Sequence, residues 1–243
     1  MNKKITLTIL IGLLAVNGCS KKNTEPEYVG TSTFPLTSDS RWDYVRNYYL
    51  IPFVDSSLAD TQTFAVTRRV VGPDTVIGSD QLYIVDDSTS RTDSSEADPF
   101  VDRHWYGIVD GQLREYGEVM FFPWETPSLS LFDNPRILLD FPLMPGKAWT
   151  ESSEDMRSVY NTVVGIEYIP VADSQVKCDV VRSRMVDDQS GHVFYDAHRW
   201  YSNSGLIHEE TDFGIEAILD SNDVVIDSVR HLRVLELIGL GDN

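Results

Sequence analysis

The sequence predicts an all-β fold, in which an antiparallel meander curls into a barrel or an open half-barrel built from two related halves. Three observations predict it. Segments with alternating or β-rich composition recur along the chain, short turn signals separate them, and a set of motifs appears twice in the same order. Long, regularly spaced strands in one sheet tend to close into barrels.

Residues 1–18 are predicted to be a secretory signal peptide. Lys3 and Lys4 form a basic start, and Ile5–Val16 is a largely apolar run of twelve residues. A run of this length is too short to cross a bilayer as a permanent helix, and it matches the apolar region of an export signal. The sequence therefore predicts export, with a mature chain that begins after residue 18.

The end of this segment resembles the lipobox of bacterial lipoproteins, because Val16-Asn17-Gly18-Cys19 matches the pattern V-x-G-C. The resemblance implies cleavage before Cys19 and attachment of fatty acyl chains, such as palmitate, to the new terminus. Ser20 stands where an aspartate retains some Gram-negative lipoproteins in the inner membrane, so the resemblance implies the outer membrane of the cell envelope. Residues 19–33 are polar and lack periodicity, which predicts a flexible tether.

The charge of the chain excludes two classes of partner. The formal net charge is −18, and removal of residues 1–18 with their two lysines would change it to −20. Nucleic acid requires clustered basic residues, and anionic lipid repels an acidic body. We therefore expect no nucleic-acid partner and attachment to the membrane through the lipid on Cys19. No feature of the sequence indicates a cofactor.

The chain repeats itself after the tether. Phe34-Pro35-Leu36 and Trp42 recur as Phe141-Pro142-Leu143 and Trp149, with one offset of 107 residues. Two further pairs keep this order but change their spacing, as insertions in loops would cause: Val70-Val71-Gly72 with Val163-Val164-Gly165, and His104-Trp105-Tyr106 with Arg199-Trp200-Tyr201. The motifs predict one β domain, residues 34–243, with repeat halves 34–140 and 141–243.

Local patterns in the first half predict strands. From Trp42 to Ile51, large apolar and aromatic side chains fall on both faces of a strand, and one face is interrupted by Arg46. Gln81–Val85 is a short run of residues typical of strands. His104–Val109 and Gln112–Tyr116 flank Asp110-Gly111, a strong signal for a two-residue hairpin turn.

The second half is predicted to be a long meander whose turns contain Pro, Gly, Asn and Asp. Its strands are expected at residues 159–169, 175–186, 192–201, 206–218 and 224–238. Two segments of the first half depart from the β pattern. Asp86–Asp98 is acidic with few apolar residues and predicts a mobile loop, and Ser128–Leu139 predicts a short helix interrupted by Pro135.

The tryptophans at repeated positions, Trp42, Trp105, Trp149 and Trp200, are predicted to be structural. A large ring at an equivalent place in both halves most simply anchors the core of each sheet, and the alternative is that some rings line a concave ligand face. Cys178 lies in an alternating run and is predicted to be a buried apolar side chain, with no internal disulfide because Cys19 is assigned to lipid.

No motif of a common hydrolase, zinc peptidase or nucleotide-binding enzyme is present. A weak candidate metal site combines Asp196, His198 and His208, which a hairpin would bring toward one face. Ordinary hydrogen-bonding roles are the favoured interpretation, and acidic pairs such as Glu209-Glu210 carry no signal in a chain with 38 Asp and Glu residues. We therefore expect no catalytic residues and no metal.

Several of these motifs resemble a group of exported bacterial proteins of unassigned function. The pattern V-V-G-x-D-T-V-x-G lies at Val70–Gly78, D-F-P-L-x-P-G-x-x-W at Asp140–Trp149, and R-W-Y-x(3)-G-L-I at Arg199–Ile207. The resemblance implies a β-rich envelope lipoprotein with a half-barrel like that of the periplasmic lipoprotein carriers, and it implies no activity.

These features predict a non-catalytic, membrane-anchored envelope lipoprotein with a binding or structural role, whose sheet binds a protein, a glycan or an apolar ligand. One alternative is a carrier or chaperone of lipidated or apolar molecules, which requires a hollow interior lined by apolar side chains. Another is a hydrolase with an unrecognised site, which requires a perturbed carboxylate or histidine in a cavity.

Overall fold

The computed structural model describes residues 30–53, 59–74, 82–92, 100–120, 128–154, 156–219 and 225–240. Cys19, the signal peptide and residues 19–29 of the predicted tether lie outside these ranges. The described elements are twelve β-strands: β1 Arg41–Pro52, β2 Asp60–Asp74, β3 Leu82–Arg91, β4 Phe100–Val109, β5 Gln112–Val119, β6 Ser130–Asp140, β7 Ala148–Glu154, β8 Arg157–Val171, β9 Ser174–Asp187, β10 Val193–Ser202, β11 Gly205–Leu219 and β12 Val225–Leu240. The described part of the chain holds no helix with the length and apolar character needed to span a membrane.

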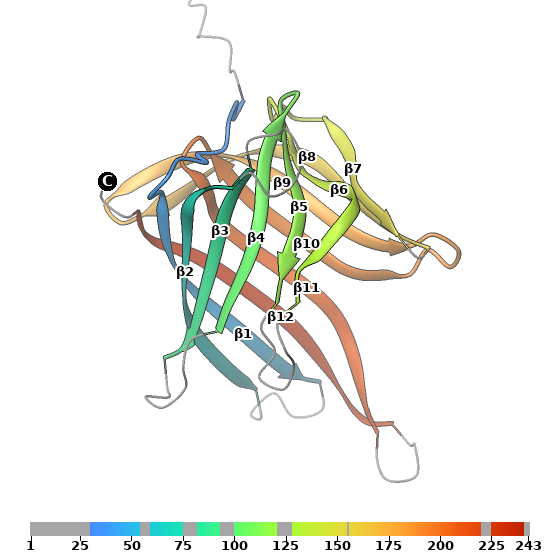
Figure 1. Cartoon of the computed structure of the whole chain (residues 1–243). Helices are drawn as coiled ribbons and strands as arrows, with labels where there is room; N and C mark the ends of the chain where they lie inside the picture. Colours follow the sequence, from blue (N-terminus) through green and yellow to red (C-terminus); the bar gives the residue numbers. More distant parts are fainter. Residues whose placement is uncertain are drawn as a thin grey trace, which may run out of the picture.

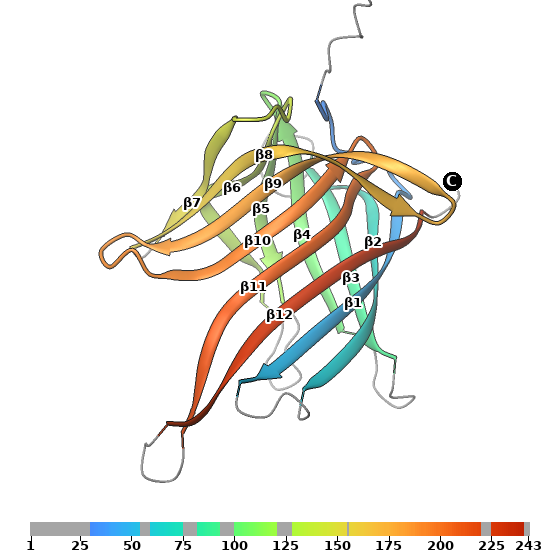
Figure 2. The same cartoon turned by 180° about the vertical axis from the view of Figure 1, so that it is seen from behind.

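The strands form one antiparallel sheet in the order β6-β5-β4-β3-β2-β1-β12-β11-β10-β9-β8-β7 (Figures 1 and 2). The sheet curls into a nearly closed barrel because the first strand pairs with the last, from Trp42 opposite Leu240 to Pro52 opposite Val229. Strands β6 and β7, at the two ends of the sheet, are not paired with each other in the described structure. The predicted all-β fold is confirmed, as a barrel with this one unsealed seam.

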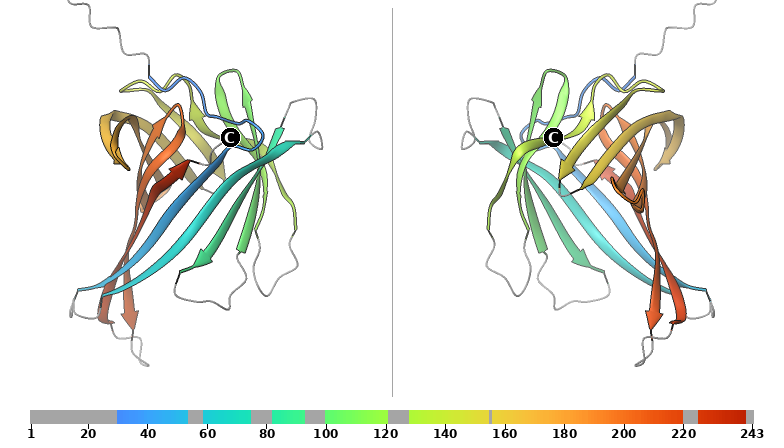
Figure 3. Two further views of the ribbon diagram at one scale, coloured as in Figure 1. Left: turned by 90° about the vertical axis from the view of Figure 1, so that its left-hand side faces the viewer. Right: turned by 90° about the vertical axis from the view of Figure 1, so that its right-hand side faces the viewer.

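We call the end of the barrel at which β1 begins the tether end, and the opposite end the far end. The strands gather at the tether end and diverge toward the far end (Figure 3). The predicted hairpin joins β4 to β5 at the tether end, where Asp110 and Gly111 have φ values of 52° and 75°. Two consecutive positive φ values are those of a type I′ turn, whose twist matches the flanking strands.

Two predictions for the first half are wrong. Ser128–Leu139 does not form a helix, since Ser130–Asp140 is the edge strand β6, which pairs with β5. The predicted loop Asp86–Asp98 begins too early, because β3 continues to Arg91. Arg68 and Arg103 neutralise the adjacent acids Asp87 and Asp86 across the sheet, so the acidic composition does not prevent strand formation here.

The tether end is filled by apolar side chains and covered by residues 30–40. Phe34 and Leu36 from this segment are 5% and 6% exposed and belong to one core cluster with residues of both halves. The Thr31 N–H donates to Asp179 Oδ2 at 2.7 Å, and the Thr31 carbonyl accepts from the Leu143 N–H at 2.9 Å. The last four residues of the predicted tether, 30–33, are therefore bound to the barrel.

The repeated motifs occupy matching places in the sheet. The pairing of β2 with β3 shifts register between Val70 and Gly72, and that of β8 with β9 shifts between Val163 and Gly165. The pairing of β4 with β5 shifts between Trp105 and Tyr106, and that of β10 with β11 between Trp200 and Tyr201. These irregularities are compatible with a duplication of six strands, which stays a prediction.

The four repeated tryptophans also share hydrogen-bond chemistry within each pair. Trp42 and Trp149 donate their indole N–H groups to backbone carbonyls, those of Ser204 and Ile137, at 2.6 and 2.9 Å. Trp105 and Trp200 donate to carboxylates, those of Asp74 and Glu167, at 3.0 and 2.9 Å. Cys178 is fully buried, and burial raises the pKa of its thiol to about 12, so it remains a neutral apolar side chain.

Gly30→Ala tests how residues 30–40 pack against the tether end of the barrel. A Cβ at position 30 would lie 1.5 Å from the Leu143 carbonyl oxygen, so this segment would have to leave its position. We expect a loss of about 1–3 kcal/mol in the free energy of unfolding, the cost of leaving buried hydrogen-bonding groups unpaired. Gly165→Ala is the control, because nothing lies within 4 Å of a Cβ there. Equal denaturant midpoints for the two variants would contradict this account.

Candidate functional site

The inner face of the barrel carries charged side chains as well as the core. Tyr44, Tyr106 and Tyr201 come from β1, β4 and β10, which are well separated in the sheet, yet all three belong to the core cluster and Tyr201 interacts electrostatically with the other two. Burial raises the pKa of all three, that of Tyr201 to about 12. The charged residues around them are Arg68, Asp87, His104, Glu115, Arg136, Glu151, Arg199, Glu209 and Arg233.

Arg68 and Asp87 form a bidentate pair between β2 and β3. Nε and Nη2 of Arg68 donate to the two carboxylate oxygens at 2.8 and 2.6 Å. Burial alone would raise the pKa of Asp87, but the Arg68 guanidinium lowers it below its ordinary value. The arginine is needed because an unpaired carboxylate in this position would be strongly destabilising.

Glu209 on β11 is held by two guanidinium groups. Arg199 Nε donates to Glu209 Oε2 at 2.8 Å, and Arg233 Nη2 donates to Oε1 at 2.5 Å. The Thr211 hydroxyl adds a third hydrogen bond, to Oε1 at 3.0 Å. Burial opposes the charge on Glu209, but the two arginines lower its pKa far below the ordinary range.

His104, Glu115 and Glu118 are the described residues whose ligand atoms come together as a metal site would require, all within 4.8 Å. His104 Nδ1 lies 2.6 Å from Glu115 Oε1. Burial lowers the pKa of His104, but Glu115 outweighs this and raises it, so a proton competes more strongly with a metal for this ring. Arg136 Nη1 lies 3.7 and 3.8 Å from Glu115 and Glu118, so a cation already balances these carboxylates.

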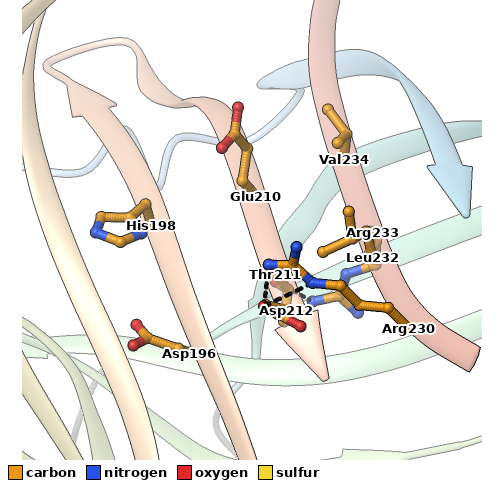
Figure 4. A pocket seen from close by; sticks show the side chains of 9 residues that line it. All are labelled: Asp196, His198, Glu210, Thr211, Asp212, Arg230, Leu232, Arg233 and Val234. Atoms are coloured by element: carbon orange, nitrogen blue, oxygen red, sulfur yellow. Dashed lines mark hydrogen bonds and ion pairs between the residues drawn. The ribbon is translucent and has the colours of Figure 1, made fainter. Parts of the chain in front are cut away.

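The three candidate metal ligands of the sequence lie on the outer face instead. Asp196 and His198 line a pocket of about 360 Å³ over β10–β12 (Figure 4). Asp196 is hydrogen-bonded by Arg182 through both oxygens, and His208 Nε2 lies 3.1 Å from Glu210. Asp196 is opposite Asp212, four residues from His208, or roughly 13 Å along the strand. The structure therefore does not bring Asp196, His198 and His208 together.

A second pocket, of about 320 Å³, lies on the inner face beside the unsealed seam, and we call it the seam pocket. It is lined by residues of β6, β7, β8, β9 and β10, among them Arg136, Glu151, Ser152, Arg157, Met185 and Tyr195. Asn161 Nδ2 donates to Glu151 Oε2 at 3.1 Å. Burial raises the pKa of Glu151 despite the nearby Arg199, so this carboxyl group gains a proton more readily than an exposed glutamate.

Sequence reasoning missed the seam pocket for a physical reason. Its residues come from five strands, and their meeting depends on the barrel almost closing. Arg136 was assigned to the predicted helix, and Arg157 and Tyr195 have the polar character of exposed strand residues. The one available signal was Arg46, a charged residue among Trp42, Tyr44 and Tyr48 on a face that otherwise appears apolar.

No family model matches the chain, and no curated protein matches it. Among solved structures, it is similar to a Bacteroides fragilis protein described as exported and having a YmcC-like fold, with 12% identity, 87% of this chain and 100% of that chain covered, and a TM-score of 0.44. A Parabacteroides distasonis protein described as a lipoprotein follows, with 15% identity, 86% and 100% coverage and a TM-score of 0.39. A β-barrel-like domain of unknown function, DUF1849, from Brucella abortus has 14% identity, 82% and 97% coverage and a TM-score of 0.30.

Glu209→Gln tests the interior ion network. The variant leaves the partly buried Arg199 and Arg233 without the Glu209 carboxylate, and we expect it to lose about 3–5 kcal/mol of stability at pH 7 in urea denaturation. Asp212→Asn is the control. It removes a partly exposed pair with Arg230 on the outer face and should cost at most about 1 kcal/mol.

The pH dependence separates the network from simple packing. Because the folded-state pKa of Glu209 lies below its ordinary value of 4.5, its contribution is present above that value and is lost as the pH falls through the lowered pKa. Wild type should therefore lose stability below about pH 4.5 more steeply than Glu209→Gln. Parallel curves for the two proteins would contradict the assignment.

Proposed function

We propose that the chain is a lipid-anchored lipoprotein of the bacterial outer membrane that binds a hydrophilic ligand inside its barrel and catalyses no reaction. The observation that carries the binding role is the charged interior beside an unsealed seam, where the seam pocket provides hydrogen-bonding groups. The anchor and the location are supported by the lipobox pattern that ends at Cys19. The glycan alternative named by the sequence fits this interior better than an apolar ligand does.

The interior argues against storage of apolar chains in the middle of the barrel. Acyl groups require apolar walls, whereas the walls here contain Arg68, Asp87, Arg199, Glu209 and Arg233. One observation favours the carrier as a second candidate. A pocket of about 410 Å³ at the far end is lined in part by Leu50, Pro52, Ala217 and Val229, so an apolar ligand would be expected there rather than in the seam pocket.

The seam pocket also supports binding over hydrolysis. Hydrolysis by paired carboxylates requires two acids that face the same reacting bond. Glu151 is the one carboxylate among the described residues that line the pocket. Glu151 therefore lacks the second carboxylate that such a reaction needs. When it is protonated, it can still donate a hydrogen bond to a ligand.

The lipid anchor is tested by growth with labelled palmitate. We expect label on the wild type and on Cys178→Ser, and none on Cys19→Ser, because one cysteine is the proposed lipid acceptor and the other is fully buried. Cell fractionation should find Cys19→Ser in the aqueous fraction and the other two proteins in outer-membrane vesicles. Label on Cys19→Ser would contradict the anchor, and inner-membrane vesicles would contradict the location alone.

The binding role is tested by screening the full chain in detergent against neutral and acidic oligosaccharides and against a fluorescent fatty acid. We expect saturable binding of at least one oligosaccharide, lost in Ser152→Trp, in which the new ring fills the seam pocket. Thr150→Trp is the control, since Thr150 is exposed on the same strand and does not line that pocket. Binding of the fatty acid alone, blocked by Ser152→Trp, would contradict a hydrophilic ligand.

A further inference from the structure

We propose that the seam pocket recognises an oxyanion, a carboxylate, phosphate or sulfate group carried by a hydroxylated molecule, through the guanidinium groups of Arg136 and Arg157. This inference rests on the proposed binding role and assigns the chemical class of its ligand. An acidic sugar unit has this chemistry, with one charged group and several hydroxyls. Three observations support it: the N–H donors of the two arginines that have no hydrogen-bonded carboxylate, the raised pKa of Glu151, and a comparison with the pocket of about 360 Å³ on the outer face, which we call the outer pocket.

Arg136 reaches the pocket from the edge strand β6 with unused donors. Its contacts with Glu115 and Glu118, at 3.7 and 3.8 Å, are too long for hydrogen bonds. Its guanidinium lies 3.8 Å from the centre of the Phe132 ring, which holds one face of the group in place. The side chain is 28% exposed, so its planar set of N–H groups remains accessible to a ligand.

Arg157, at the start of β8, has the same arrangement. Its guanidinium lies 4.3 Å from the centre of the Phe194 ring. The opposite residues are Glu154 on β7 and Asp187 on β9. The Asp187 carboxylate accepts hydrogen bonds from Gln189 and Ser190, and its interaction with Arg157 is electrostatic only. Within the described structure Arg157 forms no ion pair at 4 Å or less. An aromatic ring fixes each arginine while leaving its edge for a planar oxyanion, which a guanidinium binds through two parallel hydrogen bonds.

Glu151 does not oppose an anion in the way an exposed glutamate would. Burial raises its pKa, Glu115 adds to this effect, and Arg199, Arg136 and the Asn161 amide act against it. Glu151 therefore carries its negative charge less readily than an exposed glutamate, and its protonated form offers an O–H donor. Ser152 and Tyr195 supply further hydroxyl groups on the same wall. The volume of about 320 Å³ is at the lower end for small-molecule sites and exceeds what a bare ion needs.

In the outer pocket, the N–H groups of the arginines are already hydrogen-bonded to carboxylates of the protein. Arg230 donates to Asp212 at 3.2 and 2.6 Å (Figure 4). Asp196, which also lines this pocket, is bound through both oxygens by Arg182 of β9. The two pockets have similar volumes, about 360 and 320 Å³, and both contain arginines. Only in the seam pocket do the lining arginines lack a carboxylate at hydrogen-bond distance among the described residues, so the seam pocket is the one suited to an external oxyanion.

Isothermal titration of the full chain in detergent with galacturonate, galactose and inorganic phosphate tests the inference. We expect galacturonate to bind at least about tenfold more tightly than galactose, since its carboxylate accepts charge-assisted hydrogen bonds that the neutral sugar cannot form. Arg157→Gln should remove this preference, and Arg136→Lys, which keeps the charge but not the fork, should weaken it. Arg230→Gln is the control and should leave it unchanged.

Each outcome is decisive. Phosphate binding as tight as galacturonate binding, lost in Arg157→Gln, supports the oxyanion site and identifies the charged group as sufficient. Equal binding of galactose and galacturonate, blocked by Ser152→Trp, overturns the oxyanion inference and leaves the proposed binding role intact. Galacturonate binding that Arg157→Gln and Arg136→Lys do not change overturns it as well, as does the absence of binding by both anions. Circular dichroism of each variant confirms that the fold is retained.

Discussion

The incomplete closure of the sheet is the constraint on which the rest of this structure depends. The β1–β12 junction is paired from Trp42 and Leu240 to Pro52 and Val229, whereas the β6–β7 junction has no strand pairing in the described structure. The seam pocket lies beside this open junction, and the deeper Glu209 is stabilised by its two partners Arg199 and Arg233.

The strands at the open junction explain why it stays open. Strand β7 has 7 residues, against 16 in β12, and β6 contains Pro135, which has no N–H to donate to a neighbouring strand. The pairing of β6 with β5 shifts register twice, so its outer edge is irregular. Near the tether end a side chain bridges the two edges, since Trp149 of β7 donates to the Ile137 carbonyl of β6. The seam pocket lies at this junction, beside the same two strands.

The sequence predicted local structure better than it predicted the site. Alternation and turn residues located strands β8 to β12 to within a few residues, and Asp110-Gly111 identified its hairpin, because these signals act between neighbours in the chain. Strand β7, also in the second half, was not predicted. Ser128–Leu139 failed because pairing with β5 overrides local preference. The candidate ligands Asp196, His198 and His208 were assigned to one face, but the arginines that occupy Asp196 come from β9. Arg136, Glu151 and Arg157 could not be recognised as site residues, because the alternating pattern of a strand does not show whether a charged side chain points into the barrel or out of it.

Hydrogen exchange measured by mass spectrometry on the full chain tests the incomplete closure most directly. Strands with neighbours on both sides have their amide hydrogens protected, whereas an edge strand leaves alternate amides without a partner. We predict rapid exchange for about half of the amides in β6 and β7, and slow exchange throughout the middle of β1 and β12. Protection of β6 and β7 equal to that of β1 and β12 would show a sealed barrel and contradict the account.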